Sequence, residues 1–313
     1  MNIREIIDFV KNRERDEYAY ARKYFCFVYD VMLDEINKKN TKRNPKQKYP
    51  SLSNQQIEKI KTSIEKGNYD EDLKPLINKL VEYAGYENLL IFSKNLESLK
   101  LIKDKRFKSS FWDLRERFIS GEYHPEDNII YYYHQNSLPH EFLHVASTAR
   151  DASTKDLYFS GFRYDVKNLS FQRGLNEGYT ELLANRIFNN EHYYNDSAYT
   201  LNVYLLRIFE LLYDNQKDME KDYFLANYQG PANAFTKYGK IEEYLEFAKY
   251  LDFFAATKDY YHEDIDMFNH IMRIVKRVDD YGKMLEARKM KEEYFEQEKK
   301  AEGKVFSFTK KTF

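Results

Sequence analysis

Apolar residues recur at a spacing of three to four through most of this chain, and only its middle departs from that period. The N-terminal stretch to about residue 39 shows the spacing in Ile3, Ile6 and Val10, and again in Tyr24 and Val28. Such a period places apolar side chains on one face of an α-helix. Further helices are predicted at about 53–66, 72–83, 137–150, 173–189 and 197–215, and in several segments from 217 to 300.

β-type segments interrupt the helical pattern in the middle of the chain. After a short apolar run at Asn88–Ser93, the segment Arg117–Tyr133 predicts two strands joined by a turn at His124–Asn128. Leu157–Val166 predicts a small hairpin. The fold class predicted from these patterns is mainly α with a small β-sheet, an α+β protein.

Several helix ends carry recognisable signals. Ser53 with Gln56 three residues later forms a capping box, and Gly85 follows the predicted helix at 72–83. Ser137 is placed to cap the helix at 137–150, and Pro139 falls in its first turn, where a missing N–H is tolerated.

Charge is balanced, with 50 Lys and Arg against 51 Asp and Glu, so no overall field favours nucleic acid or a membrane surface. The stretch Asn40–Tyr49 is locally basic around Pro45 and predicts an exposed loop, with a phosphate-binding patch as the alternative. The chain is rich in aromatic residues, with 29 Tyr and 23 Phe. Tyrosine packs its ring while its hydroxyl stays hydrated, which suits a polar chain that needs a core.

The single cysteine, Cys26, has no partner for an internal disulfide, which favours a reducing compartment. Met1–Lys11 carries charges within any apolar stretch and does not resemble a secretory signal. No apolar run approaches the roughly 18 residues that a membrane span requires. A cytoplasmic location without a membrane span is therefore expected.

The segment His140-Glu141-Phe142-Leu143-His144 is an H-E-x-x-H motif on a predicted helix. Histidines four residues apart project from the same helix face, so both rings can reach one metal ion. Glu141 lies one step around the helix, where it can reach a water on that ion. Phe142 and Leu143 are expected to face the core.

A catalytic zinc site needs three protein ligands and one open position. The metzincin pattern would require Gly at 147 and His at 150, but the chain has Ser147 and Arg150. A cysteine ligand of the peptide-deformylase type has no fitting motif, because Cys26 lies in a distant helix. A carboxylate remains as the third ligand.

The next strong helix contains Asn176-Glu177-Gly178-Tyr179-Thr180-Glu181. Together with the H-E-x-x-H motif, this resembles the gluzincins, thermolysin-like zinc metallopeptidases whose second helix carries Asn-Glu and an acid four positions later. The resemblance implies that Glu177 is the third Zn²⁺ ligand after His140 and His144. It also implies that Glu181 accepts a hydrogen bond from a ligand histidine, as such histidines require.

The resemblance covers roughly residues 117–190 and implies a zincin-like catalytic core with helical flanks. The predicted organisation is an N-terminal helical region at 1–86, the core with both ligand helices at 87–190, and a C-terminal helical region at 191–313 that completes the cleft. Asn128–Tyr133 precedes the first ligand helix and is predicted to be a free edge strand that pairs with extended substrate. Its substrate-facing residues would be Ile129, Tyr131 and Tyr133.

The implied reaction is hydrolysis of a peptide bond in a peptide or protein substrate, with Glu141 as general base. A further donor, a tyrosine or a histidine such as His192 or His262, would stabilise the oxyanion, and the sequence does not single one out. One alternative is a regulatory protease that cuts a single partner, because Glu181–Arg186 resembles the acidic-x-x-Ala-Asn-Arg stretch of ImmA/IrrE-like proteins. Another is a non-enzymatic helical interaction protein that carries a relic motif.

Overall fold

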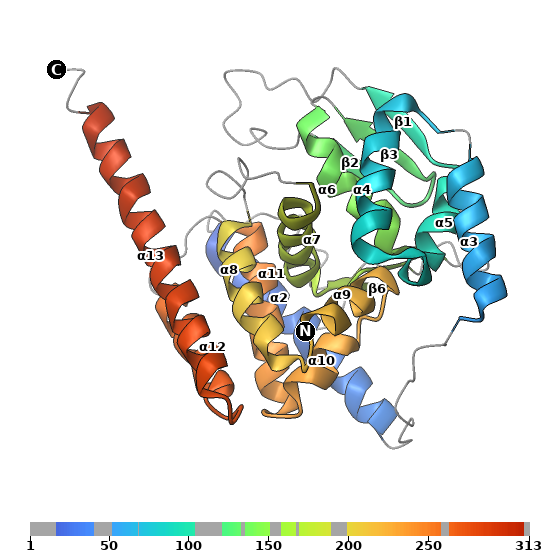
Figure 1. Ribbon diagram of the computed structural model, residues 1–313. Coiled ribbons are helices and arrows are strands. Elements are labelled where there is room, and N and C mark those ends of the chain that lie inside the picture. Colours follow the sequence, from blue (N-terminus) through green and yellow to red (C-terminus); the bar gives the residue numbers. More distant parts are fainter. Residues whose placement is uncertain are drawn as a thin grey trace.

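The chain is mainly helical and contains two small sheets, as its computed structural model shows (Figure 1). The predicted fold class is therefore confirmed, with two sheets where one sheet and a hairpin were expected. Residues 41–49 of the basic stretch, His192 and His262 lie outside the described part of the chain. The structure describes residues 17–40, 52–67, 69–103, 121–132, 135–150, 158–166, 169–188, 199–257 and 263–309.

The first sheet has the strand order β1–β3–β2. Its strands are β1 (Lys100–Lys103), β2 (Gly121–His124) and β3 (Ile129–Tyr132). On β3, Ile130 lies opposite Leu101 of the parallel β1 and opposite Tyr123 of the antiparallel β2. β2 and β3 form the predicted hairpin, and Asn128 in its turn has φ 57°, a left-handed conformation that asparagine tolerates. The Asn128 side chain donates to the carbonyl of Asn95 over 2.7 Å, which ties the turn to the neighbouring helix.

Four helices accompany this sheet: α3 (Asn54–Lys66), α4 (Lys74–Ala84), α5 (Leu90–Leu96) and α6 (Leu138–Ser147). The predicted capping box at α3 is present, because Gln56 N–H donates to Ser53 Oγ and Ser53 N–H donates to Gln56 Oε1. α4 ends before Gly85, as predicted. The apolar run at 88–93 leads into α5 and supplies Leu89 and Phe92, which are fully buried. Short 3₁₀ turns lie at Glu71–Leu73, Tyr86–Asn88 and Gln135–Ser137.

The second sheet is an antiparallel meander between α6 and the helix that begins at Arg173. Its strands are β4 (Thr148–Arg150), β5 (Tyr158–Ser160), β6 (Arg163–Val166) and β7 (Leu169–Phe171). β5 and β6 confirm the predicted hairpin. The aromatic rings of Phe159, Tyr164 and Phe171 stack along this sheet at centroid distances of 5.3 and 6.0 Å.

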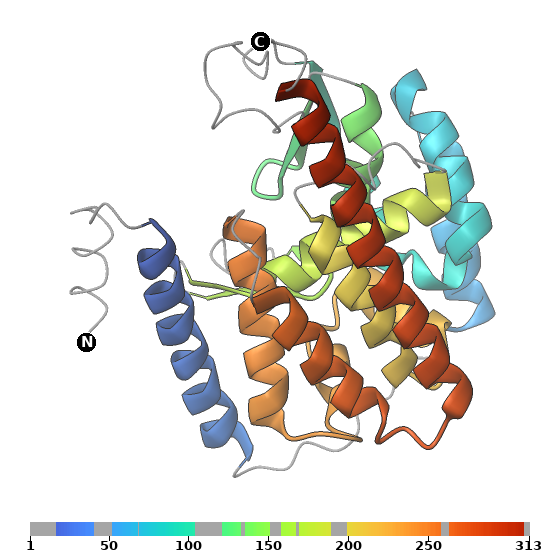
Figure 2. The ribbon, with the colours of Figure 1, turned by 90° about the vertical axis from the view of Figure 1, so that its left-hand side faces the viewer.

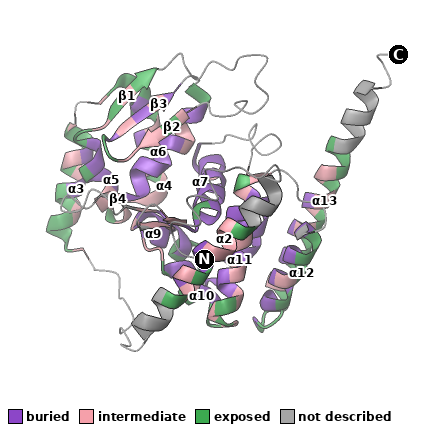
Figure 3. Cartoon of the chain, turned by 180° about the vertical axis from the view of Figure 1, so that it is seen from behind, coloured by how far each residue is buried: buried purple, intermediate pink, exposed green. Residues whose placement is uncertain are grey.

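Helix α7 (Arg173–Phe188) occupies the centre of the molecule, packed against α8 (Thr200–Phe209) and α11 (Ile241–Ala256) (Figure 1). From Gly174 to Phe188, all of its residues except Arg186 are buried, as Figure 3 shows by colour. A helix buried on every side lacks the single apolar stripe of a surface helix. Its polar residues must therefore find partners inside the protein.

The remaining helices surround α7 and its neighbours. They are α2 (Glu17–Asn40), α9 (Gln216–Phe224), α10 (Gly230–Phe235), α12 (Glu263–Val275) and α13 (Tyr281–Thr309), with a 3₁₀ turn at Glu210–Leu212. Figure 2 shows α2 alongside α11, and α13 running past α8 and α12. One cluster of buried side chains joins Val28, Phe142 and Phe209, each from a different predicted region. The division into three regions stays a prediction.

Within the described residues, none of the helices combines the length and apolarity needed to cross a membrane.

Candidate metal centre

Helix α6 is held in one rotational setting by its apolar face. Phe142 and Leu143 are fully buried, and the Phe142 ring meets Phe92 edge-to-face at a centroid distance of 5.1 Å. With that face anchored, the four-residue spacing turns His140 and His144 together toward α7. Pro139 lies in the first turn as predicted, whereas the predicted cap is wrong, since Ser137 has helical backbone angles and makes no capping bond.

The end of α6 is satisfied from outside the helix. Asn95 of α5 donates to the carbonyls of Val145 and Thr148, each over 2.8 Å. The Thr148 hydroxyl donates to the carbonyl of His144 over 2.6 Å. Because the last carbonyls of a helix have no internal partner, these bonds support the end of α6 at Ser147 and fix the turn that follows its second histidine.

The start of α7 depends on a close approach to α11. A Cβ on Gly174 would lie 1.9 Å from the Leu251 carbonyl oxygen, so a side chain there would force the two helices apart. The Gly174 N–H donates to buried Asp252 over 2.6 Å, and Asn202 donates to the carbonyls of both Gly174 and Leu251 over 2.9 Å. Asp252 thus supplies from another helix the carboxylate that usually caps a helix start.

Asn176 of the Asn-Glu pair has a structural position. Its Oδ1 accepts a hydrogen bond from the backbone N–H of Phe162 over 3.1 Å, and the residue is fully buried. This contact joins α7 to the turn of the β5–β6 hairpin, one residue before Glu177. The setting of the Glu177 side chain is therefore coupled to the second sheet.

Two imidazoles and a carboxylate converge between α6 and α7. Glu177 Oε2 lies 3.2 Å from His140 Nε2 and 3.3 Å from His144 Nε2. The two Nε2 atoms are 3.1 Å apart. All three residues are largely buried, and among the described residues they form the one group of this kind that could hold a metal ion.

The triangle fits one face of a zinc tetrahedron. Zinc bonds to histidine nitrogen and carboxylate oxygen of about 2.1 Å set neighbouring ligand atoms about 3.4 Å apart in tetrahedral geometry. The observed separations of 3.1–3.3 Å are close to that value. Two histidine nitrogens and a carboxylate oxygen can bind zinc and other divalent transition metals, and three protein ligands would leave a position for water.

Glu181 is the hydrogen-bond partner of the second ring nitrogen of His140, Nδ1. Its Oε2 lies 2.9 Å from His140 Nδ1, and the carboxylate is buried. A proton on Nδ1 would be donated to Glu181 and would leave the Nε2 lone pair facing the triangle. Two acceptors, Nε2 and Glu177 Oε2, would then face each other, an arrangement that a proton or a metal ion between them would stabilise.

The pKa values in the cluster also show that a positive charge is favoured there. Burial opposes a charged imidazole at His140, but hydrogen bonds to Glu177 and Glu181 outweigh it and hold the His140 pKa well above its usual value. Burial likewise opposes ionisation of Glu177, yet His144 and His140 keep its pKa well below the usual value. In the protein without a metal, a proton supplies the positive charge that an ion would otherwise bring.

Glu141 lies beside the three converging side chains, and there burial outweighs the attraction of the two histidines. Its carboxylate is buried, and this burial, opposed by His140 and His144, raises the pKa of Glu141 above the usual glutamate value. The backbone of Tyr123 on β2 hydrogen-bonds the carboxylate and partly counteracts the shift. A raised pKa makes Glu141 a stronger base than a solvated glutamate.

Two residues at the site escaped the sequence analysis. The Tyr199 ring, directly before α8, stacks on His140 at a centroid distance of 6.1 Å. The charge of Glu177, together with burial, holds the Tyr199 pKa well above the usual value, so its hydroxyl stays protonated. Arg173 begins α7 and interacts electrostatically with Glu177 and Tyr199. In the sequence, the four-residue spacing between Arg173 and Glu177 is the one signal that could have pointed to Arg173. Tyr199 has no such signal.

The predicted substrate-pairing strand needs correction. β3 pairs with β1 on one side and β2 on the other, so the prediction of a free edge carrying Ile129 and Tyr131 is wrong. Ile130 and Tyr132 face the core, while Ile129 and Tyr131 are half-buried on the other face. Tyr133 lies outside the described residues.

The strand with an open edge beside the metal centre is β2. It pairs only with β3 in the described sheet. A Cβ on Gly121 would lie 2.8 Å from Ser137 Oγ and 3.0 Å from Glu141 Cγ, which shows how closely β2 approaches α6. β3 is the strand nearest to α6 along the chain. In space, its hairpin partner β2 approaches α6 most closely.

The stretch Glu181–Arg186 has a structural explanation. Asn185 donates to the Glu181 carbonyl over 2.9 Å, and Arg186 forms two bonds of 2.6 Å to the Glu210 carboxylate. These contacts stabilise α7 itself, and the regulatory-protease alternative stays a prediction.

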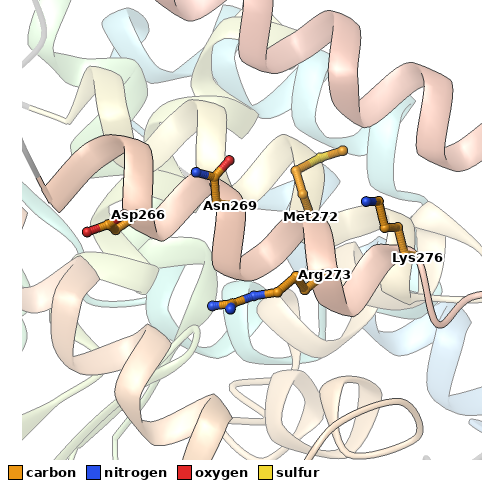
Figure 4. Close-up of a pocket in the computed structure, with 5 residues that line it drawn as sticks. All are labelled: Asp266, Asn269, Met272, Arg273 and Lys276. Atoms are coloured by element: carbon orange, nitrogen blue, oxygen red, sulfur yellow. The ribbon is translucent and has the colours of Figure 1, made fainter.

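A hollow on α12 shares no residue with the metal centre. It is open to solvent, has a volume of about 610 Å³ and is lined by four polar or charged side chains and one methionine, from α12 and the residue directly after it (Figure 4). Those residues are Asp266, Asn269, Met272, Arg273 and Lys276.

No protein-family model, curated protein or solved structure matches this chain.

Proposed function

We propose that this chain is a zinc-dependent peptidase with its metal held by His140, His144 and Glu177. The observation that carries the proposal is the convergence of three ligand atoms at 3.1–3.3 Å on a shared point between two buried helices. Buried acceptors that face one another are unfavourable unless a cation joins them. Histidine and glutamate side chains on facing helices therefore support a resident metal over a chance pair of histidines.

Zinc at this position would activate a water and polarise the carbonyl of the bond to be cut. Glu141 would accept the proton of that water and deliver it to the leaving amine, a role that its raised pKa suits. Glu181 would keep the His140 ring oriented and its Nε2 unprotonated.

Tyr199 is the proposed hydrogen-bond donor to the oxyanion that forms during attack. Its ring stacks on a ligand histidine, and its hydroxyl stays protonated near the Glu177 charge. A donor fixed where negative charge develops stabilises the transition state more than the ground state.

The open edge of β2 is proposed to pair with the substrate backbone. Main-chain pairing binds an extended peptide irrespective of its side chains and would hold the scissile bond beside Glu141. The proposed substrate is thus a peptide or an extended protein segment.

The test combines metal analysis with a cleavage assay on an unbiased peptide library. Purified protein is expected to contain about one zinc per chain. Glu141→Gln is expected to retain the metal and lose cleavage by about 10²–10⁴-fold, because general-base catalysis contributes that much. Glu82→Gln, on the exposed face of α4, is the matched control and should behave as wild type. Absence of zinc, or cleavage unaffected in Glu141→Gln, would contradict the proposal.

A further inference from the structure

Arg173 carries a positive charge that acts on the candidate metal centre. It is the first residue of α7 and lies one helical turn before Glu177, on the same face of the helix. Its side chain is exposed, in contrast to the buried residues that follow it. Tyr199, which stacks on His140, also interacts with the Arg173 charge. Within the described structure, Arg173 is therefore a cationic side chain close to the candidate ligand Glu177.

The Arg173 side chain makes no hydrogen bond or ion pair within the described ranges, although the charges of Glu177, Asp252 and Asp165 act on it. Those groups already have other contacts. Asp165 pairs with Arg163 at 2.9 Å, Asp252 accepts bonds from Tyr29 and Gly174, and Glu177 faces the two histidines. The guanidinium is thus attracted toward the site while its five N–H donors remain open to an incoming group.

The charge around the metal position makes such a cation useful. Glu141, Glu177 and Glu181 place three carboxylates in one small buried region. A substrate that carries its own carboxylate would be repelled there unless a positive group meets it. Arginine is suited to this because its planar fork binds a carboxylate through two parallel bonds and stays charged at any working pH.

Reach determines which carboxylate Arg173 could bind. Side chains four residues apart on a helix have Cβ atoms about 5–6 Å apart, and each residue of an extended peptide spans about 3.3–3.6 Å. A carboxylate one or two residues from the bond being cut is therefore within range of the guanidinium.

Resting on the proposed peptidase function, we propose that Arg173 selects substrates with a carboxylate one or two residues from the scissile bond. The carboxylate is either the C-terminal group of the peptide or an acidic side chain. Binding through Arg173 aligns the peptide along the open edge of β2 and favours cleavage near that negative charge.

The first experiment measures selectivity. A peptide that the wild type cleaves is prepared in matched forms, with a free or amidated C-terminus and with Asp or Asn near the bond. Wild type should prefer one carboxylate form by at least about 10-fold in kcat/KM, and Arg173→Gln should remove most of that preference. Arg173→Lys should restore part of it, because the charge returns without the fork. Loss of preference on amidation identifies the C-terminal group, and loss on Asp→Asn identifies the side chain.

The second experiment needs no turnover. Two hydroxamates that differ only in a carboxylate or a carboxamide are titrated into the zinc-loaded protein by calorimetry. The carboxylate compound should bind at least about 10-fold more tightly to wild type, and the difference should shrink in Arg173→Gln. Arg273→Gln, on α12, is the matched control and should keep the wild-type difference.

The outcomes separate the two proposals. Zinc uptake and cleavage with equal use of charged and neutral forms would overturn the role of Arg173 and leave the peptidase intact. The same holds if Arg173→Gln keeps the full preference. Failure to take up zinc would overturn both.

Discussion

Helix α7 carries two clusters of buried charge that are built in different ways. At its middle, Glu177 Oε2 meets the Nε2 atoms of His140 and His144, so three atoms that can each accept a hydrogen bond face one another. Near its C-terminal end, Arg186 binds the Glu210 carboxylate through two bonds of 2.6 Å, so donors face acceptors. Both clusters lie on a helix that is buried on nearly every side.

The difference separates a stabilising contact from a site. A bidentate ion pair satisfies itself, and nothing further is needed to keep its charges in the interior. The histidine–glutamate cluster is satisfied only when a proton or a metal is added. A buried group of converging acceptors is therefore a stronger sign of function than buried charge by itself.

The largest expected effect is the loss of metal from the histidine–glutamate cluster. His144→Ala removes one of three ligands, so zinc content is expected to fall from about one per chain to near zero. Elemental analysis after dialysis measures this. His270→Ala, on α12, changes a histidine outside the cluster and should keep the metal. Full zinc occupancy in His144→Ala would show that the metal is held elsewhere.

The next prediction concerns the buried ion pair between Arg186 and Glu210. Arg186→Met leaves the buried Glu210 carboxylate without its partner and is expected to lower the free energy of unfolding by about 3–5 kcal/mol. Replacing both residues, Arg186→Met with Glu210→Leu, should recover most of the loss, because no charge is left buried. Urea unfolding measures both variants.

The control for that prediction is an exposed pair. Lys237 and Asp214 form an ion pair of 2.8 Å on the surface, where Lys237→Met should change stability by less than about 1 kcal/mol. If Arg186→Met were equally mild, the contrast between the two clusters of α7 would lose its energetic basis.

A third buried carboxylate, Asp252 of α11, contacts the start of α7 and sharpens the comparison through pH. Burial raises the pKa of Asp252 to about 7, although bonds from Gly174 and Tyr29 lower it. Because the folded state holds this proton more tightly than the unfolded state, its stabilising contribution is complete below about pH 4. The contribution is lost as pH rises through about 7.

Asp252→Asn stays neutral and should not show that loss. Relative to this variant, wild type is expected to lose stability from about pH 4 to pH 7, by at most on the order of 4 kcal/mol. Urea unfolding across this range provides the comparison. Asp279→Asn, on the surface, should follow wild type. Parallel curves for wild type and Asp252→Asn would refute the prediction.

The smallest expected effect concerns the partner of a ligand. Glu181→Gln keeps the shape of the side chain but weakens its hold on His140 Nδ1, so zinc affinity should fall by about 10–100-fold. Competition with a chromogenic chelator measures this, with Glu82→Gln as the control. An unchanged affinity would show that His140 is oriented by other contacts.

Much of the fold and the metal cluster could be predicted from local patterns. The four-residue spacing of His140 and His144, and of Glu177 and Glu181, puts each pair on one face of its helix before any packing is known. The capping box at Ser53 and the hairpin turn at Asn128 are also local, and the structure contains both.

Other predictions failed, one because of a local turn and the others because they depended on neighbours distant in sequence. Ser137 makes no cap, since a 3₁₀ turn precedes α6 and gives it a helical backbone. β3 is the central strand of its sheet, because β1 pairs with it from the far side. Tyr199 and Arg173 carried no motif and became visible only through their position beside the ligands.

The sequence by itself determined which residues are presented together by each helix, because helical periodicity is a property of the local backbone. Tertiary structure decided that the two faces meet. That meeting depends on Gly174 allowing α7 to approach α11, on Asn95 closing α6, and on the apolar anchors that set the rotation of each helix. Long-range packing is not encoded in any short window, so the distances between the candidate ligand atoms and the edge position of β2 in the described sheet required the folded chain.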